Sequence, residues 1–317
     1  MSASVQQEEI APMVATDLLE VRHVTRYRYA RPVKFGRHRA MFRPHESNDL
    51  RLTSFDIDTT PNSAHHWLHD VFSNSKVVMD FDGTAPSKTL DIVCKFTIVR
   101  STILKPKFPI AEFAKRYPFV YPSEQWVDLV ALIRPEYDAP TQEVKQWASE
   151  FVDRGGGDSW EILSTINSTI HDQFDYRRRE EPGVQPPRET LSLGAGSCRD
   201  FAVLMLEAVR QLGFAARFVT GYLYDPLTDQ TDAQGRRSLQ GAGATHAWVQ
   251  VFLPGAGWVE FDPTNGLIAS GRLIRTGVAR LPSQAVPLEG SFVGAPDDFL
   301  GMDVSVDVRA IAPTLTS

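Results

Sequence analysis

Three residues far apart in the sequence are of the types that carry thiol-dependent acyl transfer. Cys198, His246 and Asp262 occur in that order, and the cysteine is one of only two in 317 residues. A cysteine nucleophile needs a base to take its proton, and a histidine base needs a carboxylate or an amide to fix its tautomer. Taken singly, each has an ordinary explanation: a small buried hydrophobe, a core or loop histidine, and an Asp-Pro turn. Together they favour a Cys-His-Asp triad.

The segment LSLGAGSCRDFAVLMLEAVRQLGF predicts that the thiol of Cys198 lies at the first position of a helix. Ser197 is the expected N-cap and Gly213 the stop, with apolar residues at helical spacing between them. The free N–H groups and partial positive charge of a helix N-terminus stabilise a thiolate and a developing oxyanion. Gly194 and Gly196 allow a sharp turn and the close approach of a substrate backbone.

His246 and Asp262 lie at the two ends of a predicted hairpin, THAWVQVFLPGAGWVEFDPTNG. Cross-strand neighbours in an antiparallel hairpin have residue numbers with a constant sum, and side chains alternate between the two faces. His246 and Asp262 can share a face only if that sum is even. We therefore expect either a loop with an odd number of residues, such as 253–257 with Phe252 opposite Trp258, or a β-bulge that shifts the register by one.

The chain divides into two halves with different residue patterns. After a tail over residues 1–17 that is expected to be disordered, short alternating or β-branched runs predict an all-β domain over residues 18–110. Prolines indicate that residues 111–122 are a connection over the surface. The remaining residues, 123–317, form the predicted catalytic domain.

The catalytic half opens with helices that must position the thiol. Thr141 is the expected N-cap of the first helix, and Asp158 with Glu161 forms a capping-box pattern before the second. The helix that begins at Cys198 is the third. The expected fold class is α+β, in which an all-β domain precedes a domain whose nucleophile helix packs on an antiparallel sheet.

Composition and charge exclude several classes of function. The formal net charge is −6, and the basic residues are scattered, so nucleic acid is not an expected partner. The N-terminus has no signal-peptide pattern, and no apolar run approaches the roughly 18 residues of a membrane span. Cys94 and Cys198 give no disulfide framework. We therefore expect a cytoplasmic protein that does not bind a membrane.

Other candidate ligand sites are weak. His65 and His69 have metal-ligand spacing only if they are helical, and no acidic or cysteine partner is nearby, so surface histidines in a turn are favoured. Cys94 alternates with apolar neighbours and is expected on the buried face of a strand, where it is inert. Residues 225–235 lack the order of a calcium loop. We expect neither a metal nor another cofactor.

The motifs around the three candidate residues resemble the transglutaminase-like superfamily, and in particular its bacterial cysteine-protease-type members. GAGSCRDFAVLM, GFAARFVTGYL and THAWVQVFLPGAGWVEFDPTNG match the three motif blocks of that family in order and spacing. YRYARPVKFGRHRAMFRP and DVFSN resemble the β-rich N-terminal region of the bacterial members. The resemblance implies a papain-like fold, with Cys198 as nucleophile, His246 as general base and acid, and Asp262 as the orienting carboxylate.

The resemblance also marks residues around the reacting atoms. Tyr176 stands where bacterial members carry a tyrosine whose hydroxyl could help to hold the oxyanion, and packing at a helix end is an equal alternative. Gly196 and Trp248 are further candidates for oxyanion binding or substrate positioning, although Trp248 is expected mainly to pack the hairpin. Leu273 and Leu281 depart from the histidine and aspartate that bacterial members often have there, which leaves specificity open.

The predicted reaction is acyl transfer on an amide bond of a protein or peptide, through a thioester. Water as the acceptor makes the protein a protease or amidase, and we favour this because nothing in the sequence identifies a dry site for an acceptor amine. An amine as the acceptor would make it a protein-crosslinking transglutaminase. A non-catalytic binding or scaffold module is the alternative from a different class, but inactive members usually lose one triad residue. The sequence indicates no oligomeric state.

Overall fold

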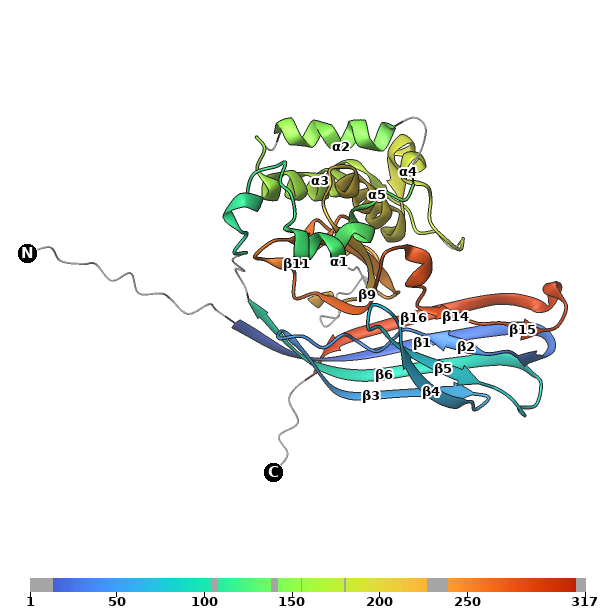
Figure 1. Cartoon of the computed structure of the whole chain (residues 1–317). Helices are drawn as coiled ribbons and strands as arrows, with labels where there is room; N and C mark the ends of the chain where they lie inside the picture. The colour runs from blue at the N-terminus through green and yellow to red at the C-terminus, as the bar shows by residue number, and fades with distance from the viewer. Residues whose placement is uncertain are drawn as a thin grey trace, which may run out of the picture.

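The structure is a computed structural model, and it describes residues 14–103, 108–137, 142–154, 156–179, 181–226 and 239–311. The molecule has three layers (Figure 1). Helices cover one side of a five-stranded sheet in the catalytic half, and the long strands of the N-terminal half lie on the other side. This confirms the predicted α+β class.

Two antiparallel sheets form the N-terminal half, as the alternating sequence runs predict. In the first sheet the strand order is β15-β1-β6-β3 with β16 also paired to β1, and in the second it is β14-β2-β5-β4. The side chains of one face of β6 point into the core, including Cys94, which is fully buried as expected. The first part of the chain contributes six of these strands: β1 (Val14–Phe35), β2 (His38–Ala40), β3 (Leu50–Thr60), β4 (Ala64–His69), β5 (Ser75–Asp80) and β6 (Ser87–Ile103).

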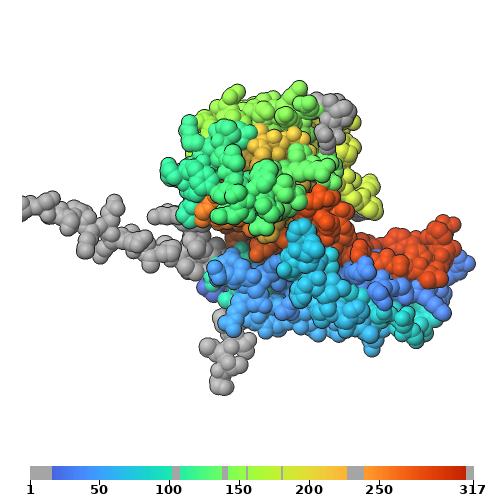
Figure 2. All heavy atoms as spheres, in the orientation of Figure 1, coloured from blue at the N-terminus to red at the C-terminus, as the bar shows by residue number. Residues whose placement is uncertain are grey.

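The last strands of the chain return to the N-terminal sheets, so the predicted catalytic domain over 123–317 is wrong at its C-terminal end. β14 (Leu288–Glu289) pairs with β2, and β15 (Phe292–Val293) and β16 (Phe299–Ala310) pair with β1. An alternating pattern predicts a strand but not the strand it pairs with. In the space-filling view the red C-terminal segment runs along both the catalytic part and the blue N-terminal layer (Figure 2).

The predicted tail also needs a correction at its inner end. β1 begins at Val14, so residues 14–17 are part of the sheet and pair with β6. Residues 1–13 of the predicted tail lie outside the described residues. The β-rich half therefore begins earlier than residue 18.

Five α-helices and three short 3-10 helices are described. Asp158 caps α3 by accepting hydrogen bonds from the N–H groups of Trp160 and Glu161, as predicted. The predicted cap Thr141 lies outside the described residues. The helices are η1 (Glu112–Ala114), α1 (Ser123–Ile133), α2 (Glu143–Arg154), α3 (Ser159–Gln173), α4 (Pro187–Leu193), α5 (Cys198–Gln211), η3 (Pro282–Gln284) and η4 (Pro296–Asp298).

The predicted surface connection over residues 111–122 is instead packed against the catalytic half. Tyr121 is 3% exposed, and its hydroxyl donates to the carbonyl of Phe252 and accepts from the N–H of Ala215. The ring of Tyr117 stacks on Phe214 at 5.7 Å. Proline-rich sequence marked a segment without regular structure, but its aromatic residues place it in the core.

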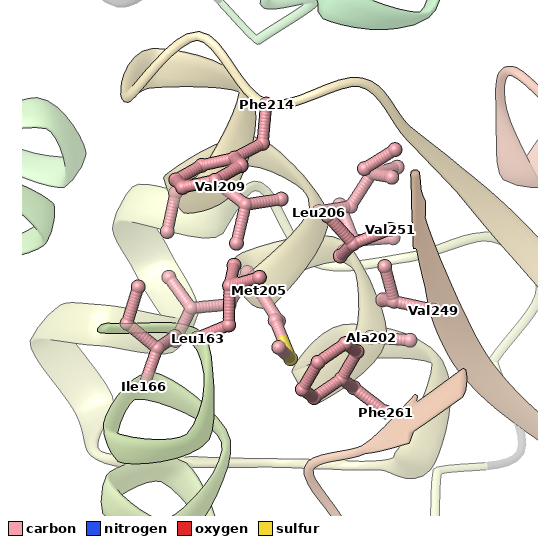
Figure 3. Close-up of a cluster of buried hydrophobic side chains, with 14 of the residues drawn as sticks. Leu163, Ile166, Ala202, Met205, Leu206, Val209, Phe214, Val249, Val251 and Phe261 are labelled. Atoms are coloured by element: carbon pink, nitrogen blue, oxygen red, sulfur yellow. The ribbon is translucent and has the colours of Figure 1, made fainter. Parts of the chain in front are cut away.

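The helix that begins at Cys198 lies at the centre of the catalytic half. Apolar side chains of α5 contact α3 on one side and the sheet on the other, as Figure 3 shows for Met205, Leu163 and Val249. The sheet has the order β12-β11-β10-β9-β13, and a two-stranded parallel sheet joins β7 to β8. These strands are β7 (Asp175–Tyr176), β8 (Ala195–Gly196), β9 (Ala216–Leu223), β10 (His246–Leu253), β11 (Gly257–Asp262), β12 (Leu267–Ile268) and β13 (Leu273–Ala279).

A side-chain amide links the N-terminal half to the edge of the catalytic sheet. Asn74 is fully buried, its Nδ2 donates to the carbonyl of Val278 at 2.7 Å, and its Oδ1 accepts from the N–H of Val278 at 2.8 Å. β13 is the edge strand, so Asn74 occupies the place of a neighbouring strand. Asp70 and His45 hold the amide at 2.8 and 2.9 Å.

Candidate active site

Cys198 is the first residue of α5, as the sequence predicts. The N-cap Ser197 is held by Asp200, whose Oδ2 accepts from the N–H of Ser197 at 2.8 Å and from its hydroxyl at 2.7 Å. The cysteine is 8% exposed, so its thiol is close to the surface at the end of a buried helix. Asp200 and Phe201 already donate their N–H groups to the carbonyl of Ser197 at 3.0 Å each. The N–H groups of Cys198 and Arg199, the first two helical positions, have no acceptor within the helix.

The hairpin has the register that a shared face requires. Phe252 pairs with Trp258 and Leu253 with Gly257, which gives the even sum 510 and a loop with an odd number of residues. The same register places Asp262 opposite Trp248, two residues from His246 on the same face. The prediction is confirmed without a bulge in β10 or β11.

His246 bridges the other two residues. Its Nε2 donates to Oδ2 of Asp262 at 2.9 Å, and both side chains are fully buried. Its Nδ1 is buried and has no nitrogen or oxygen partner among the described residues, which leaves it for the thiol of Cys198. Burial alone would lower the pKa of His246, but the carboxylate of Asp262 and the neighbouring Cys198 raise it to about 10. The structure therefore brings the three residues together in the order Cys, His, Asp.

Asp262 is held by more than the imidazole. Its carboxylate also accepts from Nδ2 of Asn265 at 2.9 Å and from the N–H of Thr264 at 3.0 Å. Burial would raise the pKa of Asp262, but His246 and these hydrogen bonds hold it below its usual value. Asn265 is a site residue that the sequence reasoning missed. An asparagine three residues after an aspartate, within a turn, is the pattern that could have identified it.

Residues 239–245 lie over the imidazole. Gln240 donates its N–H to Oδ1 of Asn265 at 2.8 Å, and a Cβ added at Gly241 would lie 2.9 Å from Nδ1 of His246. The carbonyl of Gly243 accepts from the N–H of Val306 in β16 at 3.0 Å. The segment over the site is therefore joined to Asp262 through Asn265 and to the N-terminal half through β16.

Tyr176 is close to the thiol. β7 runs parallel to β8, with Tyr176 opposite Gly196, two residues before Cys198. Burial, together with the charges of Cys198 and Asp262, raises the pKa of Tyr176 to about 12, and the nearby Arg178 acts in the opposite direction. The hydroxyl thus keeps its proton at neutral pH and can donate a hydrogen bond near the reacting atoms.

Two parts of the chain match known families. Residues 145–263 match the transglutaminase-like superfamily, and residues 19–99 match the bacterial transglutaminase-like N-terminal region. The chain belongs to the transglutaminase-like superfamily. A Mycobacterium tuberculosis protein (strain H37Rv) that is named as uncharacterized is 28% identical over 311 residues, 94% of each chain. A Mycobacterium leprae protein is 34% identical over 119 residues, 37% of this chain and 38% of its own length.

A solved structure has the same fold as this transglutaminase-like chain. It comes from Cytophaga hutchinsonii, is described as a candidate cysteine protease, and has a TM-score of 0.68 at 16% identity. The alignment covers 96% of this chain and 95% of the other. At this identity the likeness shows the fold alone, with both the β-rich half and the catalytic half included.

Trp248 and Gly196, two of the predicted oxyanion-binding or substrate-positioning residues of this transglutaminase-like chain, are both buried. Trp248 is fully buried and stacks on His246 with ring centroids 6.0 Å apart, so it supports the imidazole. Gly196 is buried, and a Cβ there would lie 2.9 Å from Cβ of Asp200, so its small size serves packing. Trp248 therefore packs the hairpin, as was mainly expected, and the roles of Trp248 and Gly196 in oxyanion binding or substrate positioning stay predictions.

The departures from the family pattern lie outside the reacting centre. Leu273 is fully buried in a cluster with Trp248, beneath the imidazole. Leu281 follows Arg280, whose guanidinium pairs with Glu136. Leu273 therefore shares a cluster with Trp248 and with Leu239 and Ala242 of the segment over the imidazole.

The paired histidines of the N-terminal half lie on a strand rather than in a turn. His65 and His69 are exposed on β4, where they bond to Ser63 and Ser75. Among the described residues, no group of three or more His, Cys, Asp or Glu side chains could hold a metal ion. None of the helices that the structure describes has the length and apolar character needed to cross a membrane.

Proposed function

We propose that the protein is a thiol hydrolase that cleaves amide bonds in a protein or peptide substrate. The observation that carries this proposal is the buried imidazole of His246, which is fixed by Asp262 at 2.9 Å through Nε2 and presents Nδ1 to Cys198. A base held in one tautomer beside a thiol at a helix N-terminus is the arrangement that nucleophilic acyl transfer needs.

The steps follow from the protonation of the pair. Because the pKa of His246 is raised, the imidazole is a strong enough base to take the proton of the Cys198 thiol as the sulfur reacts. The sulfur attacks the amide carbonyl, and the oxyanion that forms is stabilised by the N–H groups at the start of α5 and by the hydroxyl of Tyr176. His246 gives its proton to the leaving amine. It then takes a proton from water, which attacks the thioester and releases the acid.

Hydrolysis is preferred over crosslinking because water as an acceptor needs no second binding site. The solved structure of the same fold, described as a candidate cysteine protease, supports the same choice. We also propose a cytoplasmic location, since Cys94 and Cys198 are both unpaired, as is usual for thiols in a reducing compartment.

The test is a mass-spectrometric screen of a peptide library, with and without an amine donor, using wild type, Cys198→Ala and Cys94→Ala. We expect cleavage or deamidation with wild type and Cys94→Ala, and none with Cys198→Ala. Products that carry the donor amine would instead identify a transglutaminase. The absence of any product that depends on Cys198, with the thiol intact, would refute an acyl-transfer enzyme and favour a binding or scaffold module.

A further inference from the structure

The rim of the thiol site is built from a segment rich in arginine. Residues 175–177 run beside 194–196, with the N–H of Asp175 bonded to Gly194 and that of Arg177 bonded to Gly196, each at 2.8 Å. The next residues cross the start of α5. As a result, the backbone of three consecutive arginines, 177–179, follows directly from this pairing beside the residues that lead into α5, where Arg199 comes directly after Cys198.

One of these arginines has a structural partner that neutralises it. Nη1 of Arg179 donates to Oδ1 of Asp200 at 2.7 Å, and the Asp200 side chain is fully buried. The same carboxylate holds the N-cap Ser197, so this ion pair is used to fix the start of α5. Arg177 lies 3.7 Å from Asp175, and both of these side chains are largely exposed.

The other two guanidinium groups have no carboxylate partner among the described residues. Arg199 is half-buried, and its Nη2 donates to the backbone carbonyls of Arg179 and Glu181 at 3.2 and 3.1 Å. These carbonyls orient the group but leave its charge in place. Arg178 is exposed, and no hydrogen bond or ion pair is formed by its side chain within the described ranges.

Both charges act on the position next to the sulfur. The positive charges of Arg178 and Arg199 each oppose the rise in the pKa of Tyr176 that burial and the charge of Cys198 cause. Tyr176 lies opposite Gly196, two residues before Cys198, so the backbone places Arg178 two residues from Tyr176 and Arg199 directly after Cys198. An acyl group bound to Cys198 would have its flanking atoms at this rim.

We propose that Arg178 and Arg199 form an anion subsite beside Cys198, which selects acyl donors with a carboxylate next to the reacting carbonyl, as in an acidic peptide. Arginine suits this role because its planar group binds a carboxylate through two parallel hydrogen bonds. This inference rests on the proposed thiol chemistry, since it names the substrate class for the same nucleophile.

The first test compares two alkylating reagents of equal size, iodoacetate and iodoacetamide, and needs no known substrate. The ratio of their rates with Cys198 reports the local preference for an anion. Protonated His246 also attracts the anion, so the comparison is made between variants. Arg178→Ala and Arg199→Ala should each lower the ratio about three- to tenfold at low ionic strength, and less in high salt.

The matched control is Arg177→Ala, which removes the same charge from the neighbouring position. The control ratio should stay close to that of wild type, and Arg178→Lys should keep most of the preference. The iodoacetamide rate of each variant shows whether Cys198 is still intact and accessible. An unchanged ratio in Arg178→Ala and Arg199→Ala, or an equal fall in Arg177→Ala, would overturn the subsite.

The second test identifies the source of the carboxylate. Peptides that differ only by Glu or Gln beside the reacting bond, and by a free or amidated C-terminus, are compared for conversion that depends on Cys198. A preference for Glu assigns the subsite to an acidic side chain, and one for the free C-terminus assigns it to the terminal carboxylate. Equal conversion of the Glu and Gln peptides, together with equal conversion of the free and amidated peptides, would refute the anion subsite. If no amide is converted while the iodoacetate preference persists, the proposed function fails and the subsite stands.

Discussion

We expect Asn74→Ala to destabilise the protein by about 2–6 kcal/mol. The amide of Asn74 is the partner of both backbone groups of Val278, at 2.7 and 2.8 Å, and Val278 is 1% exposed. Alanine leaves a buried N–H and a buried C=O without partners, at a cost of roughly 1–3 kcal/mol each. Asn74→Asp should be at least as harmful, because it turns a carboxylate oxygen toward the carbonyl of Val278 and toward Asp70.

The assay is guanidinium unfolding followed by tryptophan fluorescence, with linear extrapolation of the free energy of unfolding to water. Ser75→Ala is the control, since it removes only an exposed hydrogen bond to His69 at 3.2 Å, and it should change that free energy by less than about 0.5 kcal/mol. A loss below about 1 kcal/mol for Asn74→Ala would show that the amide does not replace a strand at this edge.

Further predictions concern the reacting centre. Gly241→Ala should slow alkylation of Cys198 by roughly tenfold or more, because its Cβ would lie 2.9 Å from Nδ1 of His246. Gly194→Ala is the control, because Gly194 also has a positive φ but has open space around it, and this change should not slow alkylation. Equal slowing in both variants would show that the contact with Nδ1 of His246 is not the cause. Since the folded pKa of His246 is raised from 6.5 to about 10, its contribution to stability is full below pH 6.5 and lost as pH rises to about 10. Unfolding measured across this range should show a steeper decline in wild type than in His246→Ala, and parallel curves would contradict the raised pKa. Asp262→Ala should reduce turnover less than Cys198→Ala, with circular dichroism unchanged in both, because the carboxylate orients and does not transfer the proton. A complete loss in Asp262→Ala would contradict this role.

The triad could be predicted from sequence because its geometry follows from fixed periods. The position of Cys198 depends on a cap and a glycine stop, which are local signals. The shared face of His246 and Asp262 depends on the two-residue period of a strand and on the parity of one loop, which the register of Phe252 with Trp258 satisfies.

The parts that failed depend on tertiary contacts. Nothing in the alternation of 299–310 says that this strand pairs with β1 and not with the catalytic sheet. The sequence alone could not show how deeply the ring of Trp248 is buried, because that depends on the strands and loops around it. Asn74 resembles a turn residue in sequence, while its partner Val278 is 204 residues away.

The return of β16 to β1 affects how the protein can be made. β1 leaves the ribosome among the first elements and β16 among the last, with the whole catalytic half synthesised between them. Domains usually fold as units from the N-terminus during synthesis, but this N-terminal sheet stays incomplete until translation has nearly ended. Until then the edge of β1 from Leu19 to Tyr29 is unpaired and open to other chains. The nascent chain therefore needs either a chaperone or a folded catalytic half to protect that edge, and a prematurely terminated chain would aggregate through it.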